Sequence, residues 1–209
     1  MEVQNNKEQV PFEHYLARYR VLDPGEASRR TGAEFDEQAG VFTLCLLGTT
    51  YRLHWPEYAI EADRERALAL GSLPCQTFLL RFLLEGSAAQ PSNHFVTFRE
   101  MPWGEMYIQP YTGRCLNRAA FSFGTRVAAF SAACEKLLAA RLSHGDAGYE
   151  FTLLPGYRMQ LMVWAGDDEF PPNSQILYTD NFASGFSAED RVVAGDILIS
   201  AIRQEMKRK

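Results

Sequence analysis

The sequence has none of the short motifs that define the large nucleotide-binding and hydrolase families. Neither GxxxxGK[ST] nor GxGxxG occurs, so a glycine-rich phosphate-binding loop of either kind is excluded. A GxSxG turn is also missing, and none of the cysteines has a neighbouring histidine. The four histidines are isolated and form no HExxH or HxH pattern. These absences exclude enzymes that are defined by such motifs, but they leave open a site assembled from scattered residues.

Positive charge and long apolar runs are also scarce. The chain has 21 lysines and arginines against 26 aspartates and glutamates, a formal net charge of -5. A mildly acidic chain binds phosphate backbones poorly, so we expect no nucleic-acid partner. No apolar run approaches the roughly 20 residues of a membrane span, so we expect no membrane partner. The first residues lack the basic start and apolar core of a signal peptide, which predicts a cytoplasmic location.

Cysteine is present without any of its usual patterns. The four cysteines are Cys45, Cys75, Cys115 and Cys134, and no two of them form a CxxC pair. Scattered cysteines, most of them inside apolar segments, are typical of buried free thiols in a reducing cytosol. The pattern therefore predicts neither disulfides nor a zinc finger, and by itself it does not supply the ligands of an iron–sulfur cluster.

The residues that are present suit one well-packed domain. With 209 residues, 46% of them hydrophobic, the chain is long enough for a single core, and we predict one domain over residues 1–209. Hydrophobic spacing and capping residues predict a helix within 7–20 that follows Pro11, and further helices at 24–31, 73–85, near 125–138 and from 188 to the end. Strands are predicted at 41–47, 50–55, 94–100, 105–111, 149–155, 157–166 and 174–179. Hairpins separated by helices predict an α+β fold, a mainly antiparallel sheet with helices packed on it.

The first candidate site is a run of three carboxylates, Asp167, Asp168 and Glu169, between a strand and two prolines. Divalent cations such as Mg²⁺ need several oxygen ligands that converge on one point, and these side chains could supply some of them. Adjacent residues of an extended chain point in opposite directions, so at most two of the three could meet one ion. The alternative, which the neighbouring glycine and prolines favour, is a sharp turn whose acids face water or accept backbone N–H bonds.

The second candidate site is Arg99, Glu100 and Trp103, at the end of an apolar strand. Arginine can hold a ligand carboxylate with two hydrogen bonds, and the indole offers a flat face, so these residues could form the floor of a ligand pocket. The alternative is an ion pair that locks a hairpin, for example between Arg99 and a carboxylate of the 167–169 turn. Because both polar clusters end apolar strands, we predict that a ligand lies between them.

The order of these segments resembles a known family. The pieces that carry the resemblance are Asp23-Pro24, Ala27, Arg30, Gly32-Ala33, Phe98-Arg99-Glu100, Arg114, Leu116, Phe123-Gly124, Leu154-Pro155, Trp164-Ala165-Gly166-Asp167-Asp168-Glu169-Phe170-Pro171, Ile176-Leu177-Tyr178 and Ser187-Ala188-Glu189-Asp190. From about residue 20 onward the chain resembles an uncharacterised family of prokaryotic domains of unknown function, found chiefly in anaerobic bacteria and archaea. Some members sit behind an iron–sulfur domain like that of corrinoid iron–sulfur proteins.

The resemblance implies a link to corrinoid, other tetrapyrrole or one-carbon chemistry, by association. We therefore expect a cytosolic ligand-binding or accessory domain that serves such metabolism, with a corrinoid or iron–sulfur protein as partner. A metal-dependent hydrolase or transferase, with the ion held by Asp167, Asp168 and Glu169, is one alternative. A structural or protein-interaction module without a ligand is the other.

Overall fold

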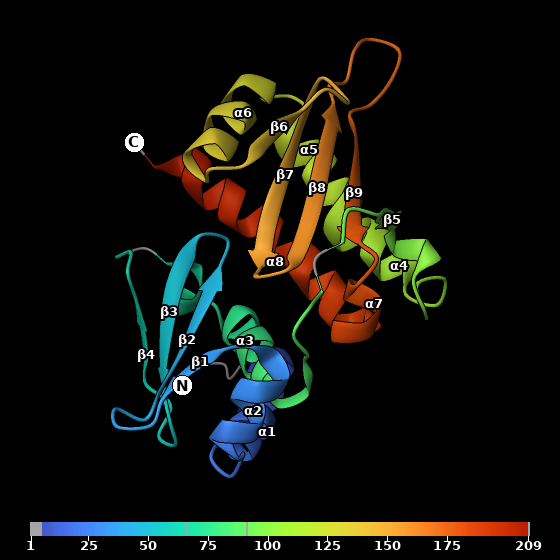
Figure 1. Ribbon diagram of the computed structural model, residues 1–209. Helices are drawn as coiled ribbons and strands as arrows, with labels where there is room; N and C mark the ends of the chain where they lie inside the picture. The colour runs from blue at the N-terminus through green and yellow to red at the C-terminus, as the bar shows by residue number, and fades with distance from the viewer. Residues whose placement is uncertain (1–5, 66, 91, 209) are drawn as a thin grey trace. The chain divides into compact units, whose positions relative to one another are not determined.

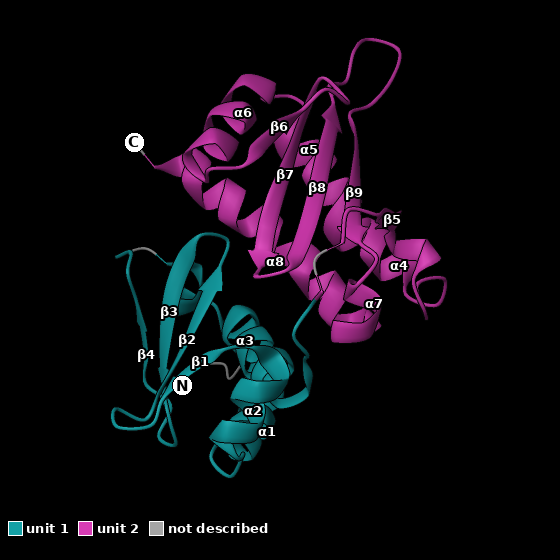
Figure 2. Ribbon diagram, viewed as in Figure 1, with its two compact units in different colours: residues 1–89 teal, residues 90–209 magenta. Residues whose placement is uncertain are grey.

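The computed structural model describes residues 6–65, 67–90 and 92–208. These residues gather into two compact units, residues 1–89 and residues 90–209, which Figure 2 shows in separate colours. Each unit combines helices with an antiparallel sheet, so the predicted α+β class, with helices packed on mainly antiparallel strands, is confirmed. The single domain over residues 1–209 stays a prediction, because two compact units can still unfold together.

The helices of the first unit lie where the sequence predicts them, except that the first begins at Asn6, five residues before Pro11. They are α1 (Asn6–Tyr19), α2 (Pro24–Thr31) and α3 (Leu73–Glu85), with a 3₁₀ turn η1 (Leu68–Gly71) before α3 (Figure 1). Asp23 caps α2 by accepting the N–H of Glu26 at 2.9 Å, and Gly32 ends this helix in a left-handed conformation, with φ 71°. Ser72 caps α3 by accepting the N–H of Cys75. The three helices predicted in this unit are confirmed.

The sheet of the first unit is a meander of consecutive antiparallel strands. Its strands are β1 (Glu34–Asp36), β2 (Val41–Leu46), β3 (Thr49–His54) and β4 (Ile60–Ala62), in the order β1-β2-β3-β4. The predicted hairpin is confirmed: Leu46 pairs with Thr49, and Gly48 takes a positive φ of 71° in the tight turn between them. Tyr19 at the end of α1 packs its ring against Phe42 of β2, with centroids 6.2 Å apart, so the helices cover a face of this sheet.

The second unit is built on a larger sheet. Its strands are β5 (Phe95–Thr97), β6 (Ala140–Leu142), β7 (Ala147–Leu154), β8 (Tyr157–Trp164) and β9 (Asn173–Thr179), in the order β5-β9-β8-β7-β6. All neighbouring strands are antiparallel. The three predicted strands at 149–155, 157–166 and 174–179 correspond to β7, β8 and β9. The long strands therefore occupy the centre, and three-residue strands form both edges.

The helices of the second unit supply the other half of its core. They are α4 (Ile108–Tyr111), a π-helical segment η3 (Thr112–Asn117), α5 (Arg118–Phe123), α6 (Val127–Lys136), α7 (Phe182–Gly185) and α8 (Ala188–Lys207). Figure 1 shows α5 and α8 behind the sheet, and the ring of Phe130 on α6 meets Tyr149 of β7 with centroids 5.7 Å apart. Ser187 caps α8 in a capping box with Asp190, as predicted for the last helix. Within the described residues, no helix is both long and apolar enough to cross a membrane.

One predicted hairpin is wrong. Residues 105–111 do not form a strand, because Ile108–Tyr111 is helix α4, with Pro110 in its first turn, where the missing N–H of proline costs no hydrogen bond. The strand predicted at 94–100 is shorter, since β5 ends at Thr97 and residues 98–100 form a 3₁₀ turn, η2 (Phe98–Glu100). The second predicted site therefore lies on a turn and a loop that lead from a sheet edge into a helical region.

Candidate functional site

Residues 101–107, here called the Trp103 loop, present three large apolar side chains to solvent. Trp103 is 68% exposed, Met106 is 73% exposed and Tyr107 is 39% exposed. Met101, the first residue of the loop, is buried. Trp103 has φ 63°, a left-handed conformation that residues other than glycine rarely adopt. Folded domains normally bury most apolar groups of this size, so their concentration on one short loop needs a physical reason.

The polar residues predicted at this site lie beside the Trp103 loop but do not pair with each other. Arg99 forms an ion pair with Glu105 of the loop, with 2.9 Å from Nε to Oε2, and both side chains are exposed. Glu100 instead accepts the backbone N–H and the hydroxyl of Thr97, both at 2.7 Å, in a capping box on η2. The backbone N–H of Thr97, and then its hydroxyl, hold the pKa of Glu100 below its ordinary value. The structure thus assigns Glu100 a local structural contact and leaves Arg99 and Trp103 accessible.

A buried arginine lies beneath the Trp103 loop. Arg191 on α8 is 1% exposed, and its Nη2 donates a hydrogen bond to the carbonyl oxygen of Pro102 at 2.5 Å. Its guanidinium also lies over the ring of Phe98, 5.7 Å from the centroid, and Phe98 in turn stacks on Tyr111 at 4.1 Å. The pKa of Arg191 is lowered, chiefly by loss of solvation. The inner side of the loop is therefore fixed to the core of the second unit.

The first candidate site is a turn that uses one of its acids to hold its own backbone. Asp167 Oδ1 accepts the N–H of Phe170 at 2.7 Å and that of Glu169 at 2.9 Å. These two donors lower the pKa of Asp167, with the N–H of Phe170 the larger cause. Asp168 and Glu169 are exposed to solvent. This geometry is the sharp turn that the sequence offers as the alternative to a metal site.

The two predicted polar clusters are the one at Arg99, Glu100 and Trp103 and the acidic turn at 167–169. Among the described residues, no hydrogen bond or ion pair is seen between them. Thr97, where β5 ends, pairs with Leu177 of β9, and the acidic turn joins the other end of β9 at Asn173. These points are four residue steps apart along the strand, about 13 Å of chain. Figure 1 shows the loop between β8 and β9 beyond the end of the sheet, away from the segment that precedes α4. One ligand that spans Arg99, Glu100, Trp103, Asp167, Asp168 and Glu169 stays a prediction.

For the predicted metal site at Asp167, Asp168 and Glu169, the described residues supply no further cluster of ligands. Among the described residues, no group of three or more histidine, cysteine, aspartate or glutamate side chains is arranged to hold a metal ion. The carboxylate that the turn orients, Asp167, already accepts two backbone donors. A cation at Asp167, Asp168 and Glu169 stays a prediction.

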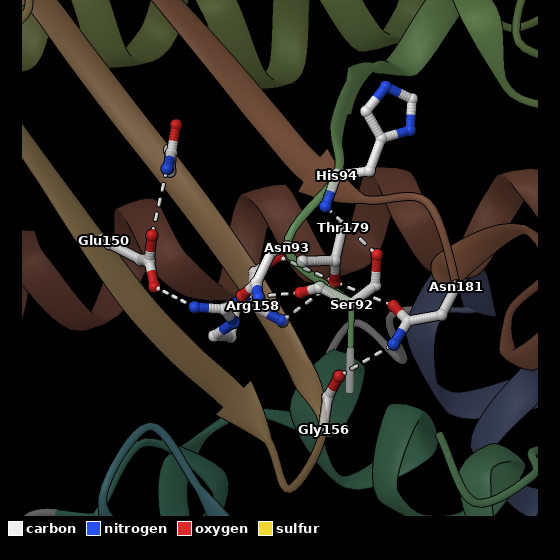
Figure 3. Close-up of polar contacts among 9 residues, drawn as sticks. Ser92, Asn93, His94, Glu150, Gly156, Arg158, Thr179 and Asn181 are labelled. Atoms are coloured by element: carbon white, nitrogen blue, oxygen red, sulfur yellow. Dashed lines mark hydrogen bonds and ion pairs between the residues drawn. The ribbon is translucent and has the colours of Figure 1, made fainter. Parts of the chain in front are cut away.

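A third polar cluster, which was not predicted from the sequence, lies at the hairpin between β7 and β8 (Figure 3). Arg158 forms an ion pair with Glu150, with 2.7 Å from Nη1 to Oε1, and its Nη2 donates to Asn93 Oδ1 at 2.5 Å and to the carbonyl oxygen of Ser92. Asn181 donates to the carbonyl oxygen of Gly156 at 2.9 Å. These contacts fix the segment that enters β5 onto the central strands.

The contacts of this cluster explain why it is structural. Both terminal nitrogens of Arg158 form polar contacts, Nη1 with Glu150 and Nη2 with Ser92 and Asn93. The guanidinium also lies over the ring of Phe95, 5.3 Å from the centroid. The sequence holds one signal for it: Glu150 and Arg158 are charged residues in apolar strands on either side of a two-residue turn, and such positions face each other diagonally across a hairpin.

The buried cysteines offer little nucleophilic character. All four are free, and Cys75, Cys115 and Cys134 are buried, as predicted, whereas Cys45 is exposed because it faces outward from β2. Burial raises the pKa of Cys75 and of Cys115 to about 12, so both are protonated thiols at neutral pH. Their contribution is to packing rather than to chemistry.

The comparisons with known proteins identify the family of the chain. The sequence pattern of a domain of unknown function, DUF3786, matches residues 23–201 and so spans parts of both compact units. No curated protein and no solved structure matched the chain. Since the family pattern covers most of the chain, including the Trp103 loop, the acidic turn and the Arg158 cluster, this protein belongs to the DUF3786 family.

Proposed function

We propose that this protein is an accessory domain that binds a partner protein through the Trp103 loop. The observation that carries the proposal is the exposure of Trp103, Met106 and Tyr107 within five consecutive residues. Tryptophan, tyrosine and methionine are enriched in the cores of protein interfaces, and tryptophan and tyrosine dominate their binding energy. A drug-sized ligand, in contrast, is held in a concave pocket that buries most of its surface, and side chains this exposed do not line such a pocket.

The support beneath the loop strengthens the proposal. Met101 is buried, Arg191 holds the carbonyl oxygen of Pro102, and the Arg99–Glu105 ion pair braces the outer side. A surface that is already ordered loses little conformational entropy when a partner docks, so more of the contact energy appears as affinity. Arg99 adds a charged group at the rim, where arginine can hold a carboxylate of the partner.

The partner class that we propose is a corrinoid or iron–sulfur protein of anaerobic one-carbon metabolism. The family resemblance supports it, because some similar chains carry an iron–sulfur domain like that of corrinoid iron–sulfur proteins. Within the 209 residues the cysteines form no pattern that could ligate a cluster. The iron–sulfur domain would therefore be a separate folded part that contacts the Trp103 loop. A cytosolic setting, which the free thiols support, is compatible with such a partner.

The test is a binding titration of the full chain against a purified corrinoid iron–sulfur protein, carried out without oxygen and followed by biolayer interferometry. We expect Trp103→Ala to weaken binding by about 30-fold, the effect of removing a central aromatic contact. The matched control is Phe121→Ala, since Phe121 is 64% exposed but lies on α5, away from the loop in sequence. Equal binding by wild type and Trp103→Ala, or equal losses in both variants, contradicts the proposal.

Two further variants separate the Trp103 loop from the two-cluster site predicted from the sequence. If the bound surface spans both clusters, Arg99→Ala and Asp168→Ala both lose binding. If it is the Trp103 loop alone, Arg99→Ala weakens binding and Asp168→Ala leaves it unchanged. Visible absorption spectra of the chain mixed with cobalamin or haem complete the set, because a shifted spectrum with either small molecule would replace the partner protein by a tetrapyrrole ligand.

A further inference from the structure

Arg191 is a costly residue to bury. It is the largest fully buried side chain described, at 1% exposure, and it lies in the first turn of α8. The positive end of the helix dipole lies at that turn and disfavours a cation there. A guanidinium also loses much of its solvation inside a protein, and a hydrophobic side chain of similar volume avoids that cost. One of its nitrogens, Nη1, is buried without a hydrogen-bond partner among the described residues.

The side chain of Arg191 forms one hydrogen bond within its own helix and one to the Trp103 loop. Its Nε donates to the carbonyl oxygen of Ser187 at 3.2 Å, within its own helix. Its Nη2 donates to the carbonyl oxygen of Pro102 at 2.5 Å, across 89 residues of sequence. The groups that favour its charge are Tyr178 of β9 and the neighbouring Asp190. Of the two hydrogen bonds that the Arg191 side chain donates, the one that leaves α8 is therefore the one that reaches the Trp103 loop.

The atom that Arg191 holds belongs to the backbone of the Trp103 loop. The Pro102 carbonyl belongs to the peptide unit that joins Pro102 to Trp103, and the orientation of that unit depends directly on the φ angle of Trp103. Trp103 has φ 63°, which for a residue with a Cβ persists only when its surroundings impose it. The loop's own backbone bonds are local, from Gly104 N–H to Met101 and from Tyr107 N–H to Trp103 and Gly104. The Arg191 contact adds the link from the loop to the core.

We infer that Arg191 is a positioning residue for the binding surface, which orients the Pro102–Trp103 peptide and so keeps Trp103 in its left-handed, outward-facing conformation. The inference rests on the proposed function for its biological meaning, but its structural content stands apart from any partner. A guanidinium suits this task because its planar, rigid donor fork fixes a direction as well as a distance. Lysine, with a single flexible ammonium, keeps the charge and loses the fixed direction.

The test is a double-mutant cycle on the full chain, with no partner present. Glycine adopts a φ of 63° without strain, so Trp103→Gly removes the need for an imposed conformation. We expect Arg191→Lys to lower the Tm clearly more when residue 103 is tryptophan than when it is glycine. Equal losses of Tm in the two backgrounds would show that Arg191 serves general packing and would overturn the inference. Arg191→Lys is used because it retains charge and length, and Arg191→Met gives the larger perturbation where it folds.

Hydrogen exchange supplies a second readout that general destabilisation does not reproduce. In Arg191→Lys we expect the amides of residue 101 and residues 103–107 to exchange about fivefold faster or more, as for the loss of one hydrogen bond, while those of β8 and β9 keep their wild-type rates. Uniformly faster exchange across the second unit, or no change in the loop, would contradict the inference. Loss of loop order together with unchanged partner binding would instead refute the proposed function and leave the positioning role intact.

Discussion

At the scale of single residues, Gly104 allows the tight fold of the Trp103 loop because it has no Cβ atom. A Cβ at this position would lie 2.1 Å from the carbonyl oxygen of Phe98 and 2.9 Å from that of Met101, both of them backbone atoms. Backbone that is already hydrogen-bonded into η2 and the loop cannot shift cheaply to make room. The glycine therefore lets the loop fold back tightly on the turn that precedes it.

We predict that Gly104→Ala destabilises the protein by about 1–3 kcal/mol, the usual cost of forcing a methyl group into a packed space. The matched control is Gly113→Ala, because a Cβ there meets nothing within 4 Å and the residue is helical. The control should be about 0.5–1 kcal/mol more stable than wild type, since alanine favours a helix over glycine. Chemical denaturation measures both values, and a neutral Gly104→Ala would show that the loop is not held as described.

The residue scale also shows what the sequence could and could not predict. Asp23, Ser72 and Ser187 are recognisable caps, because a cap depends on residues within three or four positions along the chain. The role of Arg191 depends on a carbonyl group 89 residues away, and no local pattern contains that information. The one available signal was an arginine in the first turn of a helix, against the dipole.

At the scale of elements, the region between β5 and α5 is where pattern and structure disagree. Residues 105–111 contain an isoleucine and two tyrosines, which favour strands, but Pro110 cannot donate to a sheet ladder and is tolerated in the first turn of α4. The helical run then continues through η3 and α5 to Phe123, a stretch with no helix predicted. The central strands and the capped helices were predictable because each carries its own periodicity and its own end signals. The predicted site residues were found as exposed polar groups, while their actual partners, Glu105 and Thr97, depend on the turn that follows β5.

The acidic turn between β8 and β9 gives a prediction about pH. The folded pKa of Asp167 is lowered, so its contribution to stability is complete above its unfolded pKa and is lost as pH falls through the folded pKa. We expect Asp167→Ala to melt below wild type at pH 7, and we expect this gap in Tm to shrink as the pH is lowered below about 4. Asp168→Ala, which removes an exposed carboxylate, serves as the control and should match wild type throughout.

The same variants test the predicted cation. If Asp167, Asp168 and Glu169 hold a divalent ion, millimolar Mg²⁺ raises the Tm of wild type, and Asp168→Ala reduces that rise. If the turn is structural, as its backbone hydrogen bonds favour, Mg²⁺ changes neither protein. Melting curves with Mg²⁺, Mn²⁺ and Zn²⁺ at pH 7 distinguish the two outcomes.

At the scale of the whole molecule, the open question is whether two compact units make one cooperative domain. The family pattern covers residues 23–201 and so runs through the boundary at residues 89 and 90, which favours one inherited domain. Segments on both sides of the boundary are tied to their own unit. Arg30 donates to the carbonyl oxygens of Leu83 and Gly86 in the first unit, and Asn181 donates to that of Gln90 in the second.

We predict that the full chain unfolds in a single transition. The tryptophans report on each unit separately, because Trp55 lies in the first and Trp164 in the second. One variant keeps only Trp55 and the other keeps only Trp164, and the other two tryptophans of each variant are replaced by phenylalanine. Coincident fluorescence curves in urea would support one domain over residues 1–209, whereas two separated midpoints would divide it in two.

Both sheets end in strands of three residues, β1 and β4 in one unit and β5 and β6 in the other. An unpaired edge is a template on which a foreign extended peptide can add itself as one more strand, as in fibril growth or domain swapping. An edge strand of three residues can form only a few backbone hydrogen bonds with such a peptide. Short edges therefore disfavour unwanted strand addition, and we expect a partner of this chain to be recognised through side-chain contacts more than through backbone pairing.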